Sequence, residues 1–156
     1  MLLLFSYRIF MISISELYEN GNFHTSLQNF KVPDDYKFHC FQGLREYYVQ
    51  LTANRFTNHK RTILNKEWKL APFGFLYDNT NRPIPPKPND LEYLENISFI
   101  LSKAFDYVRI DLYYRPFYKP QKIIVGEITL THGGGTERCI PNEWDAKLGS
   151  LWHMKN

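Results

Sequence analysis

Two segments in the C-terminal half of the chain alternate between apolar and polar residues. They are Tyr107–Tyr114 and Ile123–Thr131. This period of two is typical of β-strands, because successive side chains of a strand point to opposite faces of the sheet. The segment between them, Arg115–Gln121, contains two prolines and suits a loop that joins antiparallel neighbours. We therefore expect a pair of adjacent antiparallel strands.

The polar positions of these two strands carry charge. Arg109 and Asp111 share one face of the first strand, and Glu127 and Thr129 share one face of the second. In an antiparallel pair the two acids can face each other, and their mutual repulsion is removed by a divalent cation between them. Magnesium favours a few carboxylates together with substrate phosphates, and Arg109 is a forked donor for phosphoryl oxygens. The alternative is two solvated acids paired with Arg109 and Lys122.

If the second strand is uninterrupted, its side chains alternate between the two faces of the sheet. This alternation places Val125 on the face of Glu127 and Thr129. Gly126 then shares the other face with Ile128.

A run of three glycines follows this strand directly, within Thr131–Thr136. Glycines let backbone amides approach an anion closely, so Gly133 and Gly134 are candidates for contact with phosphate. A glycine run is most often only a turn, but its place after a strand with a Gly-Glu-x-Thr pattern favours a functional role. His132 could act as an acid or base near neutral pH, or it could be a solvated loop residue.

The remaining pattern predicts an α+β fold with a mostly antiparallel sheet. Two aromatic-rich runs around a glycine turn indicate a hairpin, and an apolar stripe behind a capping residue indicates a helix. A second, shorter helix is expected to dock through Trp144, Leu148 and Leu151. The expected elements are the hairpin strands Tyr36–Phe41 and Glu46–Thr52, the helix Asn89–Phe105 with Leu91, Leu94, Ile97, Leu101 and Ala104 toward the core, and the helix Glu143–Leu151.

Length and composition restrict the class of protein. A chain of 156 residues fits one domain, and a net charge of +3 suits an anionic ligand but not a dedicated nucleic-acid binder. Two cysteines, Cys40 and Cys139, make neither a disulfide scaffold nor a zinc site, so we expect a reducing, cytoplasmic location and a buried Cys40. No apolar run reaches the roughly 20 residues of a membrane span, and the apolar segment Met1–Ser13 lacks the basic start and cleavage site of a secretory signal.

A basic segment lies between the hairpin and the prolines. It contains Arg55, His59, Lys60 and Arg61. This segment has three possible interpretations. Arg55 or Arg61 could contact phosphate, the segment could be an ordinary solvated loop, or it could form a polyanion-binding surface together with the nearby aromatic residues. The near balance of acids and bases argues against nucleic acid as the partner.

Several motifs occur together in the order found in one superfamily. The combination resembles the C-terminal part of ATP-grasp proteins, in particular the TupA-like branch of teichuronopeptide biosynthesis, which is often labelled glycosyltransferase-associated. The motifs that carry the resemblance are Asp35–Gly43, Arg55–Arg61, Val108–Tyr113, Val125–Gly135 and Pro141–Gly149.

The resemblance implies a ligase-type activity. ATP-grasp enzymes bind Mg-ATP between two α+β subdomains, phosphorylate a carboxylate, and let a nucleophile, usually an amine, attack the acyl phosphate. It further implies that Asp111 and Glu127 hold magnesium and that Arg109 contacts the phosphoryl group. Thr129 stands where relatives commonly have Asn as the third ligand. Lys37 lies on a strand that lines the nucleotide cleft, and the glycine loop borders the acceptor site.

The resemblance also implies partners and a division of the chain. The cofactors would be ATP and Mg²⁺, and the partners a nucleotide and a carboxylate-bearing glycan or peptide of cell-envelope polysaccharide synthesis. Residues 1–33 are too short for the preceding subdomain with its phosphate flap, so we expect a poorly defined N-terminal segment, a C-terminal ATP-grasp-like subdomain over residues 34–156, and a missing N-terminal half. The alternative is a non-catalytic nucleotide- or glycan-binding remnant.

Overall fold

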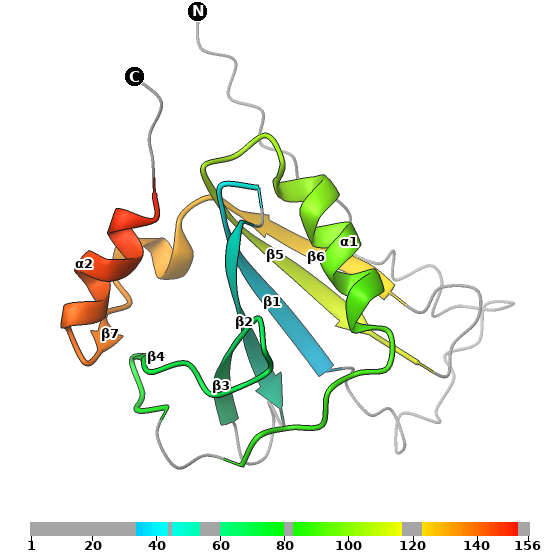
Figure 1. Ribbon diagram of the computed structural model, residues 1–156, viewed down its shortest axis with the longest axis horizontal. Coiled ribbons are helices and arrows are strands. Elements are labelled where there is room, and N and C mark those ends of the chain that lie inside the picture. Colours follow the sequence, from blue (N-terminus) through cyan, green and yellow to red (C-terminus); the bar gives the residue numbers. More distant parts are fainter. Residues whose placement is uncertain (1–33, 44, 54–59, 80–82, 117–122, 153–156) are drawn as a thin grey trace, which may run out of the picture.

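A five-stranded antiparallel sheet forms the centre of the computed structural model (Figure 1). The structure describes residues 34–43, 45–53, 60–79, 83–116 and 123–152. Arg55, His59, Lys122 and the segment 1–33 lie outside the described residues. The strands, in spatial order, are β3 (Lys60–Asn65), β2 (Glu46–Ala53), β1 (Asp34–Phe41), β5 (Tyr107–Tyr114) and β6 (Ile123–Thr129).

Five further elements complete the described fold. β4 (Gly74–Phe75) pairs with β7 (Cys139–Ile140) in a second small sheet. The helices are α1 (Leu91–Ser102), α2 (Glu143–Ser150) and the short 3₁₀ helix η3 (His132–Gly135). The α+β class with a mostly antiparallel sheet is confirmed. No helix in the described ranges is long and apolar enough to cross a bilayer.

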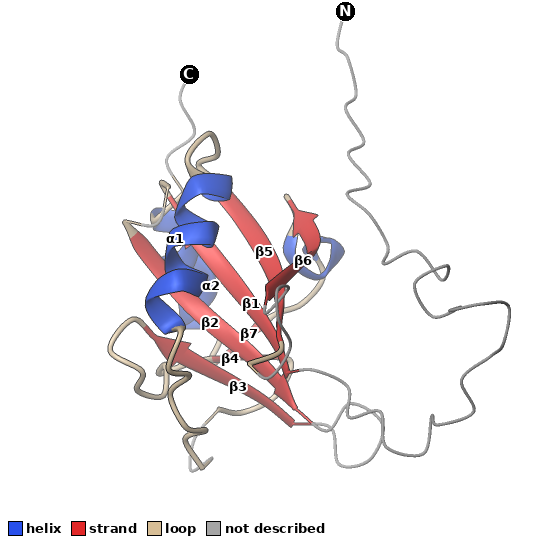
Figure 2. Ribbon diagram, turned by 90° about the vertical axis from the view of Figure 1, so that its right-hand side faces the viewer, coloured by secondary structure: helices blue, strands red, loops and turns tan. Residues whose placement is uncertain are grey.

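The face of the sheet under α1 carries the larger apolar core, and α1 and α2 lie on opposite sides of the sheet in Figure 2. Every second residue of the three central strands enters this core, as the strand period requires. Cys40 is fully buried there, as expected from the sequence. The buried side chains include Tyr36, Phe38, Cys40, Val49, Leu51, Leu64, Leu94, Val108, Ile110 and Leu112.

The opposite face of the sheet is divided. Its apolar end is covered by the β4–β7 pair and by α2, whose Leu148 is buried and whose Trp144 stacks on Phe73 at 5.0 Å between ring centroids. The docking of α2 through its apolar side chains is thereby confirmed. The other end of this face is polar and carries charged residues of β1, β5 and β6.

The first helix differs from the sequence prediction at its start. The N-cap position is Asp90, one residue after Asn89, and it makes no side-chain capping bond. The carboxylate of Asp90 instead accepts a hydrogen bond of 2.9 Å from the hydroxyl of Tyr114 on β5. The capping prediction was therefore wrong, because Asp90 makes a tertiary contact in place of a cap.

The predicted apolar stripe of α1 is only partly buried. Leu91 and Leu94 are buried, but Ser98 and Ser102 are the other two buried positions of the helix. Ile97 and Leu101 are half-buried, and Ala104 is exposed beyond the helix end. Two serines thus occupy buried positions where the sequence predicted apolar residues.

The hairpin and the C-terminal strand pair form as predicted, whereas β3 was missed. Its sequence, Lys60–Asn65, is mostly polar, and its two apolar residues are adjacent. Ile63 and Leu64 are both buried, one on each face of the sheet. β3 pairs with β2 from Ala53 to Tyr48. Pairing with an existing strand, and not local propensity, makes this segment extended.

A β-bulge at Gly126 corrects the assumed alternation of β6. Asp111 pairs with Glu127, but the next residue, Leu112, pairs with Val125, so Gly126 is an extra residue in β6. Val125 therefore packs on the α1 side with Ile128, and the prediction that it shares a face with Glu127 was wrong. Without the extra residue, Glu127 would point to the apolar core.

Gly126 is required at this bulge by lack of space. A Cβ atom there would lie 2.6 Å from Cε2 of Tyr113. We predict that Gly126→Ala lowers the free energy of unfolding by about 1–3 kcal/mol, measured by urea denaturation. The control is Gly149→Ala in α2, where nothing lies within 4 Å and stability should be equal or slightly higher. Equal stability of Gly126→Ala and the parent would contradict the prediction.

Candidate active site

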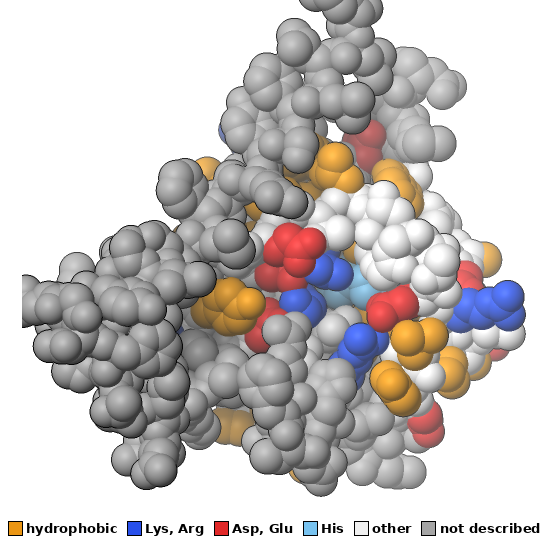
Figure 3. Space-filling view, turned by 180° about the vertical axis from the view of Figure 1, so that it is seen from behind, with side chains coloured by type: hydrophobic (Ala, Val, Ile, Leu, Met, Phe, Trp, Pro, Cys, Tyr) orange, Lys and Arg blue, Asp and Glu red, His pale blue; other side chains and the backbone are white. Residues whose placement is uncertain are grey.

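The sheet register brings three charged residues into one line. Lys37 of β1 pairs with Asp111 of β5, and Asp111 pairs with Glu127 of β6. All three lie on the face turned away from α1, where Figure 3 shows acidic, basic and histidine side chains side by side. The sequence prediction that Asp111 and Glu127 face each other across adjacent strands agrees with this register.

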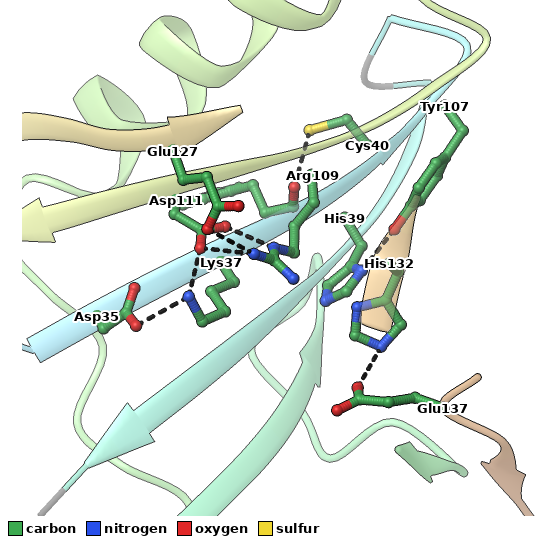
Figure 4. A network of polar contacts seen from close by, with 11 residues as sticks. Asp35, Lys37, His39, Cys40, Tyr107, Arg109, Asp111, Glu127, His132 and Glu137 are labelled. Carbon is green, nitrogen blue, oxygen red and sulfur yellow. Dashed lines mark hydrogen bonds and ion pairs between the residues drawn. The ribbon is translucent and has the colours of Figure 1, made fainter. Parts of the chain in front are cut away.

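The two acids are linked through cations of the chain itself (Figure 4). Arg109 donates from Nε to Oδ1 of Asp111 at 2.7 Å and from Nη2 to Oδ2 at 2.9 Å. The same Nη2 donates to Oε2 of Glu127 at 3.1 Å. Lys37 contacts Oδ2 of Asp111 and also lies 2.9 Å from Oδ2 of Asp35. We call Asp35, Lys37, Arg109, Asp111 and Glu127 the charged cluster.

Burial makes these contacts strong. Asp111 is 3% exposed, and a buried carboxylate is tolerated only when it is paired and hydrogen-bonded. Burial alone would lower the pKa of the Arg109 guanidinium, but Asp111 and Glu127 outweigh it and hold that pKa above its ordinary value. Arg109 therefore stays charged. Glu127 is the accessible member of the cluster, since its side chain is 59% exposed.

The oxygen donors of the cluster fit a magnesium ion. Asp111 and Glu127 supply carboxylates from adjacent strands, and Thr129 is the register partner of Arg109 on the same face. Oγ1 of Thr129 is buried and has no hydrogen-bond partner in the described part of the chain. The described residues contain no group of three or more His, Cys, Asp or Glu side chains that could hold a metal. Magnesium here would therefore need ligands from phosphate or water in addition.

Two histidines adjoin the charged cluster. His39 is the register partner of Arg109, and its Nδ1 lies 3.1 Å from the hydroxyl of Tyr107. The ring of His132, from η3, packs edge-on against His39 at 4.6 Å between centroids. Nε2 of His132 lies 2.8 Å from Oε2 of Glu137. The sequence placed His132 in a solvated or catalytic loop, whereas the structure packs it against the sheet.

Burial keeps both histidines neutral. It lowers the pKa of His39 well below the ordinary value, and the nearby positive charge of Arg109 lowers it further. Burial also lowers the pKa of His132 to about 4, although Glu137 partly opposes this.

A cavity of about 210 Å³ opens beside these histidines. Aromatic side chains and the loop after β6 form much of its wall, and its polar lining includes His39, His132 and Glu137. Asp145 and Leu148 of α2 close another side. The cavity therefore adjoins the charged cluster at the position of His39.

The glycine loop is a tight, left-handed turn. Gly133 and Gly134 have φ angles of 55° and 62°, which other residues rarely adopt. A Cβ at Gly133 would also lie 2.4 Å from Cγ of Glu137. The amide of Gly134 donates to the carbonyl of Thr131, so this amide is used inside the loop.

The other predicted residues have different surroundings. Arg61 lies on the same face of the sheet but pairs with Glu137 at 3.1 Å, and its guanidinium lies over the ring of Tyr77. Contact of Arg61 with phosphate stays a prediction. Burial raises the pKa of the Cys40 thiol to about 12, which agrees with its assignment to the core.

Sequence reasoning did not single out four polar residues in or beside the charged cluster. Gln50 and Thr52 of β2 are buried beside Lys37 and Asp35, and Oε1 of Gln50 has no hydrogen-bond partner among the described residues. Glu137 and Asp35 were also not singled out. The available signal was the alternation of the hairpin, in which Gln50 and Thr52 occupy the polar positions of a strand opposite Lys37.

A family model described as TupA-like ATPgrasp matches residues 17–153. The chain belongs to this family. The match includes the three strands of the charged cluster, the glycine loop and α2. No curated protein and no solved structure gives a significant match. Membership of the TupA-like ATP-grasp family indicates an ATP-grasp type of function for the chain.

The neutral histidines make stability depend on pH. Unfolded histidines take up protons near pH 6.5, whereas His39 and His132 stay neutral in the fold, so the unfolded state binds more protons. We predict that the free energy of unfolding falls as pH decreases from 7.5 to 5, by up to about 2 kcal/mol for each histidine. Urea denaturation at several pH values measures this.

His132→Gln provides the comparison for this prediction. It removes one of the two groups, so it should reduce the pH dependence by about half. A parent protein whose unfolding free energy is constant over this range would show that the histidines are not held neutral.

Proposed function

We propose that the charged cluster binds a magnesium–nucleotide complex, with ATP as the nucleotide. The observation that carries the proposal is the pairing of Asp111 with Glu127 across adjacent strands, bridged by Arg109, in a chain of the TupA-like ATP-grasp family. Asp111 and Glu127, with Thr129, are the proposed ligands of magnesium. Magnesium would neutralise charge on the β- and γ-phosphates during transfer.

The basic residues have the complementary role. Arg109 and Lys37 each carry more than one donor and now contact carboxylates, and phosphate oxygens are equivalent acceptors for both. Arg109 would hold the phosphoryl group that is transferred, and Lys37 the nucleotide. Gly133, Gly134, Arg55 and Arg61 remain candidate contacts of the nucleotide or the acceptor.

The proposed reaction is the activation of a carboxylate. An oxygen of the acceptor carboxylate attacks the γ-phosphorus, which releases the nucleoside diphosphate and forms an acyl phosphate. An amine then attacks the carbonyl carbon, and inorganic phosphate and one proton leave. The acceptor class we propose is a carboxylate-bearing glycan or peptide of cell-envelope polysaccharide synthesis, handled in the cytoplasm.

A second candidate is a non-catalytic nucleotide- or glycan-binding role. It is favoured by the complete pairing of Asp111 within the chain, since both of its oxygens already contact Arg109 or Lys37. The two candidates differ in turnover. Release of nucleoside diphosphate by the purified chain would exclude the non-catalytic role, and nucleotide binding without such release would favour it.

We predict that nucleotide binding depends on magnesium and on Glu127. In isothermal titration calorimetry, Glu127→Gln should weaken Mg-ATP binding at least about tenfold, since one charged ligand is lost. Asp111→Asn should have a larger effect. The matched control is Glu143→Gln on α2, because the side chains of Glu127 and Glu143 are 59% and 65% exposed.

Three results would reject the proposed site. They are equal affinity of Glu127→Gln and the parent, equal loss in Glu143→Gln, and nucleotide binding that is the same with and without magnesium.

A further inference from the structure

The charged cluster already contains a cation that bridges its two acids. Nη2 of Arg109 donates to Oδ2 of Asp111 at 2.9 Å and to Oε2 of Glu127 at 3.1 Å. A divalent ion that bridges the same carboxylates would compete with Arg109 for these oxygens. In Figure 4 the guanidinium lies beside the two acids, on the side of His39.

Separating Arg109 from the two carboxylates without supplying another anion costs free energy. Its side chain is 12% exposed, and a mostly buried guanidinium that loses its carboxylates keeps an unpaired charge. Lys37 contacts the same Oδ2 of Asp111 and is itself 11% exposed, and it also lies 2.9 Å from Oδ2 of Asp35, which remains its partner. A free divalent ion would therefore displace Arg109 from both of its carboxylates and supply it with no new anion.

A metal–polyphosphate complex has the opposite effect. It brings a cation for Asp111 and Glu127 and, in the same molecule, anionic oxygens for Arg109 and Lys37. Every charge then keeps a partner after the exchange. Free polyphosphate would attract Arg109 and Lys37 but leave the two carboxylates facing each other without a counter-ion.

We infer that Arg109 is a specificity-determining residue that excludes free divalent cations from Asp111 and Glu127 and admits them only with a polyphosphate. This inference rests on the proposed function and adds that the divalent cation binds only together with a polyphosphate. It predicts strong reciprocal coupling, in which polyphosphate tightens metal binding and metal tightens polyphosphate binding by the same factor.

The test measures binding of Mn²⁺ alone to the full chain, by electron paramagnetic resonance of the free ion. The parent should bind Mn²⁺ weakly, and Arg109→Gln should bind it at least about tenfold more tightly, because both carboxylates lose their bridging cation. The matched control is Arg45→Gln, which removes the same charge from the exposed turn between β1 and β2 and should behave as the parent. Arg109→Gln combined with Asp111→Asn should lose the gain.

A second titration uses inorganic tripolyphosphate as the probe. Tripolyphosphate should tighten Mn²⁺ binding by the parent at least about tenfold. In Arg109→Gln the same probe should tighten Mn²⁺ binding by a much smaller factor. If Arg109→Gln fails to fold by circular dichroism, Lys37→Met is the second variant. It frees Oδ2 of Asp111 from one cation and should give a smaller gain of about threefold for Mn²⁺ alone.

The results separate this inference from the proposed function. Tight binding of Mn²⁺ alone by the parent, or no gain in the folded variants, overturns the inference while Mg-ATP binding stands. Failure of the parent to bind Mg-ATP rejects the proposed function. The Mn²⁺ titration of Arg109→Gln contains no nucleotide, so it tests only the competition between Arg109 and a divalent ion.

Discussion

The buried carboxylate of Asp111 is the interaction on which the polar half of the structure depends. A charge that is 3% exposed must have counter-ions within reach, and Asp111 has Arg109 on its own strand and Lys37 on the neighbouring strand. Arg109 in turn contacts Glu127 on β6. The three strands β1, β5 and β6 are thus connected by one set of ion pairs in addition to the ladder of the sheet.

The second constraint is the division of one face of the sheet between an apolar and a charged end. α2 and the β4–β7 pair bury the aromatic end, where Phe73 and Phe75 pack. They leave the charged cluster outside this cover. His39 and His132 occupy the boundary, and their neutral state reflects burial next to the positive charge of Arg109. This arrangement places a cavity beside a group of charges.

The sequence predicted much of this site because strand alternation is a local property. Asp111 and Glu127 were predicted to face each other, and the register agrees. That prediction assumed an uninterrupted β6. Val125 packs under α1, so in an uninterrupted strand the side chain of Glu127 would also have pointed to the core. The bulge at Gly126 is what aligns the two acids. No local pattern predicts a bulge here, since a bulge is defined by the pairing of β6 with β5. The division at residue 33 and the roles of the site residues stay predictions.

The sequence by itself determined the α+β class, the hairpin, the C-terminal strand pair, α2 and the chemical types of the site residues, because these follow from periods of two and of about 3.6 residues. Only the tertiary structure decided which cations the acids contact. Lys37 lies 74 positions before Asp111 in the chain and reaches it because β1 pairs with β5. The same holds for the contact of Glu137 with Arg61. Such contacts depend on strand order and register, which are fixed by packing of the whole sheet and not by any single segment.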